Sequence, residues 1–124
     1  MSTFTFQSII AWQKAHEFTK LVYHMTKHFP EDERFGLVSQ FRRAAVSIGA
    51  NIAEGYKKLS KADKLRFLNI SEGSTAECMN YIILSYDLEY VTEEEYKILC
   101  TSIEDVGRLL TAYCNGIINN NAIK

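Results

Sequence analysis

The chain has 124 residues, of which 47% are hydrophobic and 23% are charged, and its formal net charge is −1 at pH 7. This length and composition suit one domain with one hydrophobic core. One proline and six glycines are fewer turn residues than all-β proteins usually need. The net charge gives no global signal for nucleic acid, so any such binding requires a local basic patch.

The cysteines and the N-terminal residues indicate a reduced compartment. Cys78, Cys100 and Cys114 are odd in number and form no C-x-x-C motif, which favours structural thiols. Residues 1–8 (MSTFTFQS) lack the basic and apolar regions of an export signal. No uncharged apolar run approaches the roughly 18 residues of a membrane span. We therefore expect a cytoplasmic protein without a membrane partner.

The first helix is predicted over residues 9–29. Apolar residues recur at steps of three and four from Ile9 to Phe29, which is the period of an amphipathic helix. Pro30 ends this pattern, and Ser8 is the expected N-cap.

The second helix is predicted over residues 32–58, because the acidic EDER run at its start suits the helix dipole. Its main apolar stripe consists of Leu37, Phe41, Ala44, Ala45, Ile48 and Ile52. A second apolar edge consists of Val38, Val46, Gly49, Ala53 and Tyr56. A helix with two apolar edges must be covered on two sides.

The third and fourth helices are predicted over residues 60–89 and 92–118. Ser60 and Thr92 each precede an acidic residue by three positions, which is the pattern of a capping box. The apolar residues of the fourth helix alternate steps of three and four, as in a helix that packs lengthwise on its neighbours. Residues 119–124 are expected to form a frayed tail.

These elements predict an all-α fold, an antiparallel up-down-up-down four-helix bundle. The bundle is expected to fill a single domain over residues 9–118. An N-terminal segment, residues 1–8, precedes it, and the tail follows.

Three small residues, Gly49, Ala50 and Ala53, stand inside the second helix. Glycine in a helix costs about 1 kcal/mol relative to alanine. Small side chains let two backbones approach closely, and that approach offsets the cost. The second helix is then either central in its own bundle or in contact with another subunit through these three residues.

Polar residues form a stripe of their own on the second helix, at Gln40, Arg43, Ser47, Asn51, Glu54 and Lys58. The hairpin with the third helix sets Arg43 opposite Glu77, and Ser47 opposite Glu72 and Gly73. We expect a partly buried polar network with an Arg43–Glu77 ion pair, which fixes register more than it stabilises. The members of this network are Ser47, Asn51, Glu54, Glu72 and Glu77. The alternative is a solvated face.

Several sequence blocks carry a resemblance to a known family, and they are IAWQKAH (10–16), FP (29–30), ERFGL (33–37), QFRRAAVSI (40–48), ANIAEG (50–55), RFL (66–68), GS (73–74) and Glu77. With them the chain resembles the bacterial four-helix-bundle proteins named after open reading frames in 23S rRNA intervening sequences. The resemblance implies a homopentameric ring. It also implies kinship with the accessory protein of diversity-generating retroelements, a pentamer that binds nucleic acid and a reverse transcriptase.

Charge is expected to separate along the bundle axis. One end gathers acidic residues, namely Glu31, Asp32, Glu33, Asp87, Glu89, Glu93, Glu94 and Glu95. The other end gathers Lys57, Lys58, Lys61, Lys64 and Arg66. In a ring of parallel protomers the basic end becomes a rim that can hold phosphates. Helix-dipole complementarity is the alternative, and it explains Lys57 and Lys58 but leaves Lys61 and Lys64 unexplained.

No catalytic, cofactor or metal motif is recognisable in the sequence. No glutamate precedes a histidine by three residues, as a di-iron bundle requires. His24 and His28 are expected on the surface, and His16 in a packed, hydrogen-bonded position. Neither of the common glycine-rich phosphate loops is present.

The sequence therefore favours a non-enzymatic oligomeric scaffold that binds structured RNA or DNA, or a protein partner. The candidate contact residues are Arg42, Arg43, Lys57, Lys58, Lys61, Lys64 and Arg66. The alternative is a protein–protein interaction or structural module that binds no nucleic acid.

Overall fold

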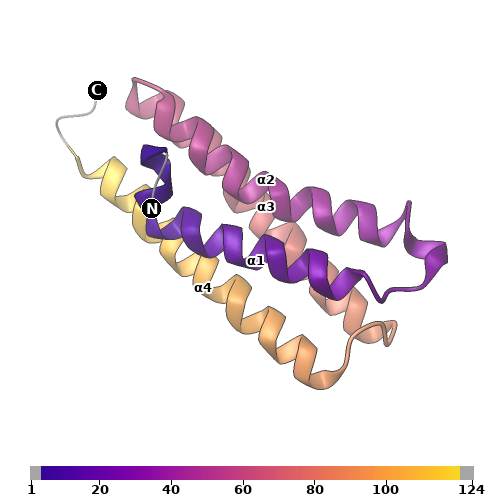
Figure 1. The fold of residues 1–124 in the computed structure, drawn as a ribbon. Coiled ribbons are helices and arrows are strands. Elements are labelled where there is room, and N and C mark those ends of the chain that lie inside the picture. The colour runs from indigo at the N-terminus through magenta and orange to yellow at the C-terminus, as the bar shows by residue number, and fades with distance from the viewer. Residues whose placement is uncertain (1–3, 121–124) are drawn as a thin grey trace.

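The computed structural model describes residues 4–120 and contains four long helices, with no strand in that range (Figure 1). The helices are α1 (Ile10–Thr26), α2 (Leu37–Lys57), α3 (Lys61–Asp87) and α4 (Glu93–Ile118). Two short 3₁₀ turns, η1 (Thr5–Ser8) and η2 (Glu31–Glu33), precede α1 and α2. The all-α, four-helix prediction is confirmed.

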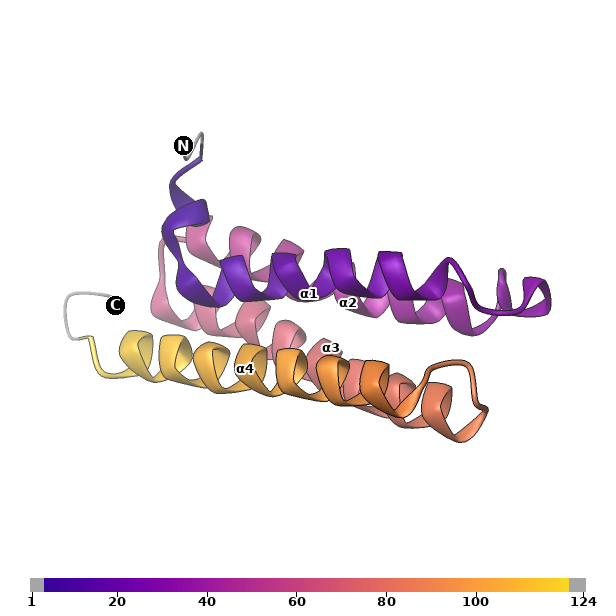
Figure 2. The same ribbon diagram turned by 60° about the horizontal axis from the view of Figure 1, so that its bottom comes forward.

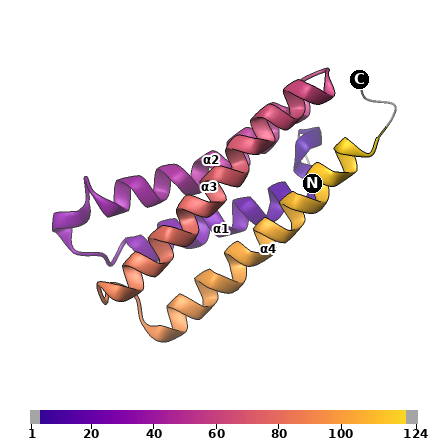
Figure 3. The same cartoon turned by 180° about the vertical axis from the view of Figure 1, so that it is seen from behind.

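The helices form a closed square in which each packs against two neighbours. α2 packs most extensively on α3, α3 on α4, and α1 on both α2 and α4, whereas the backbones of the diagonal pairs stay apart. Figures 2 and 3 show the same arrangement from below and from behind. Among residues 4–120, no helix is long and apolar enough to cross a membrane.

Side-chain contacts join the connections at each end of the bundle. At one end the Tyr90 hydroxyl donates to the Glu33 carboxylate at 2.8 Å, and its ring contacts Phe29. At the other end the Lys61 ammonium donates to the carbonyl of Ile118 at 2.9 Å. The α1–α2 and α3–α4 connections therefore share one end, and the α2–α3 connection lies beside the end of α4 (Figure 1).

A continuous apolar core runs along the axis of the square. Its largest fully buried side chains are Phe18, Phe41, Ile48, Ile52, Leu68, Ile82, Leu99, Ile103 and Leu110. All four helices contribute to this set at helical spacing, as the apolar stripes predicted. Within residues 4–120 every fully buried side-chain nitrogen and oxygen has a hydrogen-bond partner.

Two of the predicted caps are confirmed. The Ser60 hydroxyl accepts from the backbone N–H of Asp63 at 3.1 Å. Thr92 and Glu95 form a complete capping box, with bonds of 3.1 and 2.8 Å. These two caps start α3 and α4 at the expected residues.

The predicted N-cap of the first helix and the predicted start of the second are wrong. Ile9, and not Ser8, is the N-cap of α1, since the Ser8 hydroxyl donates back to the carbonyl of Thr5. α2 begins at Leu37 rather than at residue 32, because the acidic run forms the separate turn η2. Of the predicted end segments, residues 1–3 and 121–124 lie outside the described residues.

A close approach of α1 and α2 sets the surroundings of the glycine in the second helix. The Thr19 hydroxyl donates to Ala45 O of α2 at 3.0 Å, which requires neighbouring backbones. A Cβ at Gly49 would lie 3.5 Å from Trp12 Nε1. Gly49 therefore packs inside the chain, on the Trp12 ring. Ala50 is exposed and Ala53 half-buried, so their contact with another subunit stays a prediction.

Replacing Gly49 by alanine is expected to stabilise the fold. The new Cβ would make ordinary van der Waals contacts, at 3.5 and 3.7 Å, with Trp12. Alanine is better than glycine in a helix by about 0.8–1.0 kcal/mol. Urea unfolding should show a gain of that size. Gly73→Ala, whose Cβ would meet nothing within 4 Å, is the matched control and should gain as much. A net loss in Gly49→Ala alone would mean that Trp12 lies closer to Gly49 than these distances, and would contradict the prediction.

Candidate nucleic-acid interface

The basic end is built from the end of α2, the three-residue connection to α3, and the start of α3. Lys58 ends α2 in an extended conformation, and Ser60 caps α3 two residues later. This tight reversal gathers the predicted cations at one end of the bundle, and they are Lys57, Lys58, Lys61, Lys64 and Arg66. Each, however, has a different environment.

Two of the five cations cap the C-termini of other helices. Lys61 Nζ donates to the carbonyl of Ile118, the last residue of α4. Lys64 Nζ donates to the carbonyl of Tyr56 in the last turn of α2 at 2.8 Å. A cation at these carbonyls is favourable because the helix C-terminus carries negative partial charge. The expectation that helix electrostatics does not explain these two lysines is therefore wrong.

Two further cations flank one aromatic ring. Lys58 Nζ lies 4.9 Å from the centroid of the Phe67 ring, and Arg66 Cζ lies 5.3 Å from it. Arg66 also forms an exposed ion pair with Asp63 at 3.5 Å. These contacts hold the two charges at the surface beside the α2–α3 connection.

Lys57 differs from the other four. Its side chain is exposed and makes no hydrogen bond, ion pair or cation–π contact with residues 4–120. Lys57 is therefore the cation of this end most available to an external anion.

Arg42 and Arg43 do not belong to the basic end. Arg42 donates to the Thr26 hydroxyl at 2.8 Å and to the carbonyl of Tyr23 at 3.3 Å, so it caps the end of α1. Arg43, the next residue of α2, is exposed. Both line a groove of about 490 Å³ beside the α1–α2 connection, together with the highly exposed Phe35.

The polar network is smaller than predicted and contains no carboxylate. Asn51 donates to the Ser47 hydroxyl at 3.0 Å, and the Ser74 hydroxyl donates to Ser47 at 2.9 Å. The buried Ser71 hydroxyl donates to the carbonyl of Ile48 at 2.8 Å. These hydroxyl bonds fix the register of α2 on α3.

The predicted acidic members of this network lie outside it. Glu54 and Glu77 are exposed, and Glu72 is half-buried. No ion pair joins Arg43 to Glu77 in the described range. Ser74, one position beyond the residues expected opposite Ser47, takes their place because it is buried in the α2–α3 interface, whereas Gly73 is exposed.

The acidic end is confirmed as a place where carboxylates gather, and two of them have structural roles. Glu33 accepts from the backbone N–H of Leu37 at 3.2 Å and from the Tyr90 hydroxyl. The hydrogen bond to Glu33 raises the pKa of Tyr90 above its usual value. Glu95 closes the capping box of α4. Carboxylates and cations thus occupy opposite ends of the bundle.

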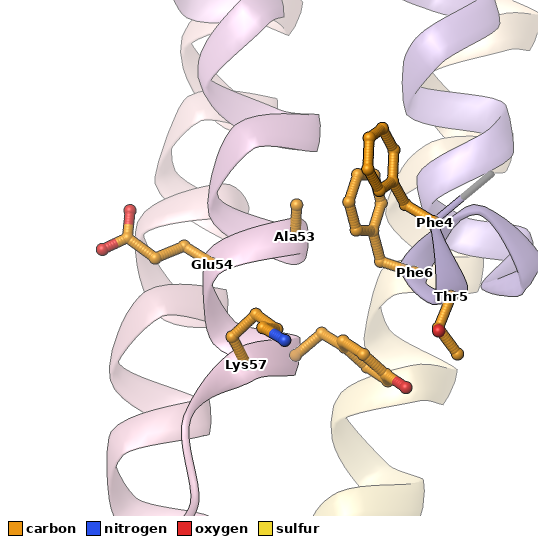
Figure 4. Close-up of a pocket in the computed structure, with 7 residues that line it drawn as sticks. Phe4, Thr5, Phe6, Ala53, Glu54 and Lys57 are labelled. Carbon is orange, nitrogen blue, oxygen red and sulfur yellow. The ribbon is translucent and has the colours of Figure 1, made fainter.

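An aromatic groove adjoins the basic end, between η1 and the last turns of α2 (Figure 4). Its volume is about 430 Å³, and its lining residues are Phe4, Thr5, Phe6, Ala53, Glu54, Tyr56 and Lys57. The helical periods do not predict this groove, because they give residues 1–8 no element of their own. The F-T-F alternation at residues 4–6 was the available signal.

Groups that could support other chemistry are dispersed. Among residues 4–120 no three His, Cys, Asp or Glu side chains come close enough to hold a metal ion. Burial raises the pKa of the Cys78 thiol to about 12, which suits a structural role. His16 is exposed and stacks on Trp12 with ring centroids 4.8 Å apart, so its predicted hydrogen-bonded packing position is wrong.

Comparison with known proteins agrees with this fold. The family model described as 23S rRNA-intervening sequence protein matches residues 7–112. A crystal structure of a protein of unknown function from the S23 ribosomal protein family of Bacteroides thetaiotaomicron is 28% identical, with a TM-score of 0.78. That alignment covers 85% of this chain and 98% of the other. No curated protein matches. Since the family model spans most of the chain, the protein belongs to the 23S rRNA-intervening sequence protein family.

Proposed function

We propose that this protein is a non-enzymatic, cytoplasmic scaffold that binds structured RNA or DNA through its basic end. The observation that carries the proposal is the concentration of five cations around the α2–α3 connection, opposite an acidic end. A local patch of this kind attracts phosphates even when the net charge is −1.

The cations that cap helices still have donors for a phosphate. A lysine ammonium carries three N–H donors, and Lys61 and Lys64 each use one on a backbone carbonyl. Lys57 uses none of its three on residues 4–120. Helix capping and phosphate binding are therefore compatible, and capping fixes the positions of two of the charges.

The proposal takes the four helices as an antiparallel up-down-up-down bundle and as one protomer of a ring, a homopentamer by the resemblance to the family. The contacts that join Tyr90 to Glu33 and Lys61 to Ile118 support the antiparallel arrangement. A ring of parallel protomers repeats the basic end around one rim, and repeated weak phosphate sites raise the overall affinity.

The second candidate is a protein-interaction module with no nucleic-acid ligand. The groove beside the α1–α2 connection favours it, since Phe35 there is 87% exposed and Arg34 stacks on its ring at 5.4 Å. Exposed aromatic and arginine side chains are enriched at the centres of protein interfaces.

Light scattering on a size-exclusion column distinguishes the two, with absorbance at 260 and 280 nm recorded together and no nuclease used in purification. The nucleic-acid scaffold predicts an oligomeric mass and a raised 260/280 ratio that falls after a high-salt wash. An oligomer with a protein-only ratio would favour the second candidate. A monomer would contradict the ring.

A further inference from the structure

The groove beside the basic end forms a slot between η1 and α2, with two aromatic rings on its η1 wall. The rings of Phe4 and Phe6 are nearly parallel, with centroids 5.9 Å apart and an interplanar angle of 6°. Figure 4 shows both rings facing α2. The small side chain of Ala53 lies opposite them on that helix. A volume of about 430 Å³ lies within the usual range of small-ligand sites.

Local contacts hold the aromatic wall in place. Phe6 packs edge-on against Trp12, with centroids 5.3 Å apart. The backbone N–H of Phe4 donates to the Gln7 side chain at 2.7 Å, and the Gln13 amide donates to the Gln7 carbonyl at 2.8 Å. A wall fixed in this way loses little conformational entropy when a ligand binds.

The charge at the slot suits an anion. Lys57 lines it, and Figure 4 shows the Lys57 nitrogen turned toward the η1 side. Glu54 also belongs to the lining, but its carboxylate points away from the two phenylalanine rings (Figure 4). The slot therefore combines exposed ring faces with a cation at its edge that has no partner among residues 4–120.

We propose that this slot receives an unpaired nucleobase of a single-stranded nucleic acid, stacked on Phe4, with its phosphate on Lys57. Aromatic stacking beside a basic surface is the common way in which proteins hold single strands, and it tolerates any base because every base has a π face. A base in a duplex cannot enter the slot without being unstacked. The inference rests on the proposed function and adds to its phosphate contacts a site for an unpaired nucleotide.

The test compares a 12-nucleotide single strand with the same strand in a duplex, in ribose and deoxyribose forms, each with a central 2-aminopurine. Phe4 is 61% exposed, so Phe4→Ala removes the stacking face without emptying the core. We expect Phe4→Ala to lose about tenfold in single-strand affinity, to leave duplex affinity unchanged, and to abolish quenching of the probe. Phe4→Trp should restore both the single-strand affinity and the quenching. Lys57→Glu should weaken binding to both the single strand and the duplex.

The outcomes separate this inference from the proposed function. Unchanged single-strand affinity in Phe4→Ala, with both affinities reduced in Lys57→Glu, would overturn the slot and leave phosphate binding standing. Absence of binding by the unmodified protein at about 50 mM salt would overturn both. A smaller oligomer in Phe4→Ala with unchanged affinity would mean that a second copy covers the groove, which also overturns the slot.

Discussion

Replacing Phe41 by alanine is expected to destabilise the protein by about 3–5 kcal/mol, the usual range for a buried phenylalanine. Phe41 is 1% exposed and lies where three helices meet. Its ring centroid is 6.4 Å from that of Phe18 on α1 and 5.9 Å from that of Tyr81 on α3. Truncation loses the transfer free energy of the ring and leaves a cavity that rigid helices fill only in part. Urea unfolding followed by circular dichroism measures the loss.

Phe35 offers a matched control, since it is the same residue type six positions earlier. It is 87% exposed, so Phe35→Ala should change the free energy of unfolding by less than about 0.5 kcal/mol. Equal losses in the two variants would mean that the helices pack differently from the square described above.

Reversing the charge of Lys57 and Lys58 together is expected to weaken RNA binding about tenfold or more at moderate salt. Neither side chain donates to a helix end within residues 4–120, so the change removes phosphate contacts without removing a cap. Losing two phosphate contacts should also reduce the steepness of the salt dependence by about 2. Fluorescence anisotropy with a labelled RNA hairpin measures both quantities.

The control for this variant is Lys14→Glu with Lys97→Glu, which makes the same change in net charge. Lys14 and Lys97 line a groove between α1 and α4, and each has an exposed acidic partner on its own helix. The control should bind RNA with little change. If both double variants lose affinity equally, net charge controls binding and the basic end has no special role.

The helix periods and two of the caps could be predicted because they depend on residues close together in the chain. Ser60 and Thr92 act within one turn, and tertiary packing does not compete with them. The start of α2 could not be predicted in this way, since the acidic run lies before the helix and still complements its dipole. Glu33 sits in η2 and accepts from the N–H of Leu37, so its charge favours the helix N-terminus without belonging to the helix.

The candidate site was predictable in position but not in detail. Helix ends fix where the cations gather, and this follows from the connections alone. That Lys61 reaches the last carbonyl of α4, 57 residues away, depends on how α4 ends beside the α2–α3 connection. The prediction of the polar network was wrong for a related reason. A shift of one position from residue 73 to Ser74 exchanges the side chain in the interface, and helical spacing does not resolve it.

The most direct test of the basic end is the affinity of the unmodified protein for an RNA hairpin, measured between about 50 and 200 mM salt. Engagement of four or more phosphates predicts a plot of log affinity against log salt with a slope of about −3 to −5. A flat plot, or no binding at the lowest salt, would contradict the account and leave the protein-interaction module as the function to pursue.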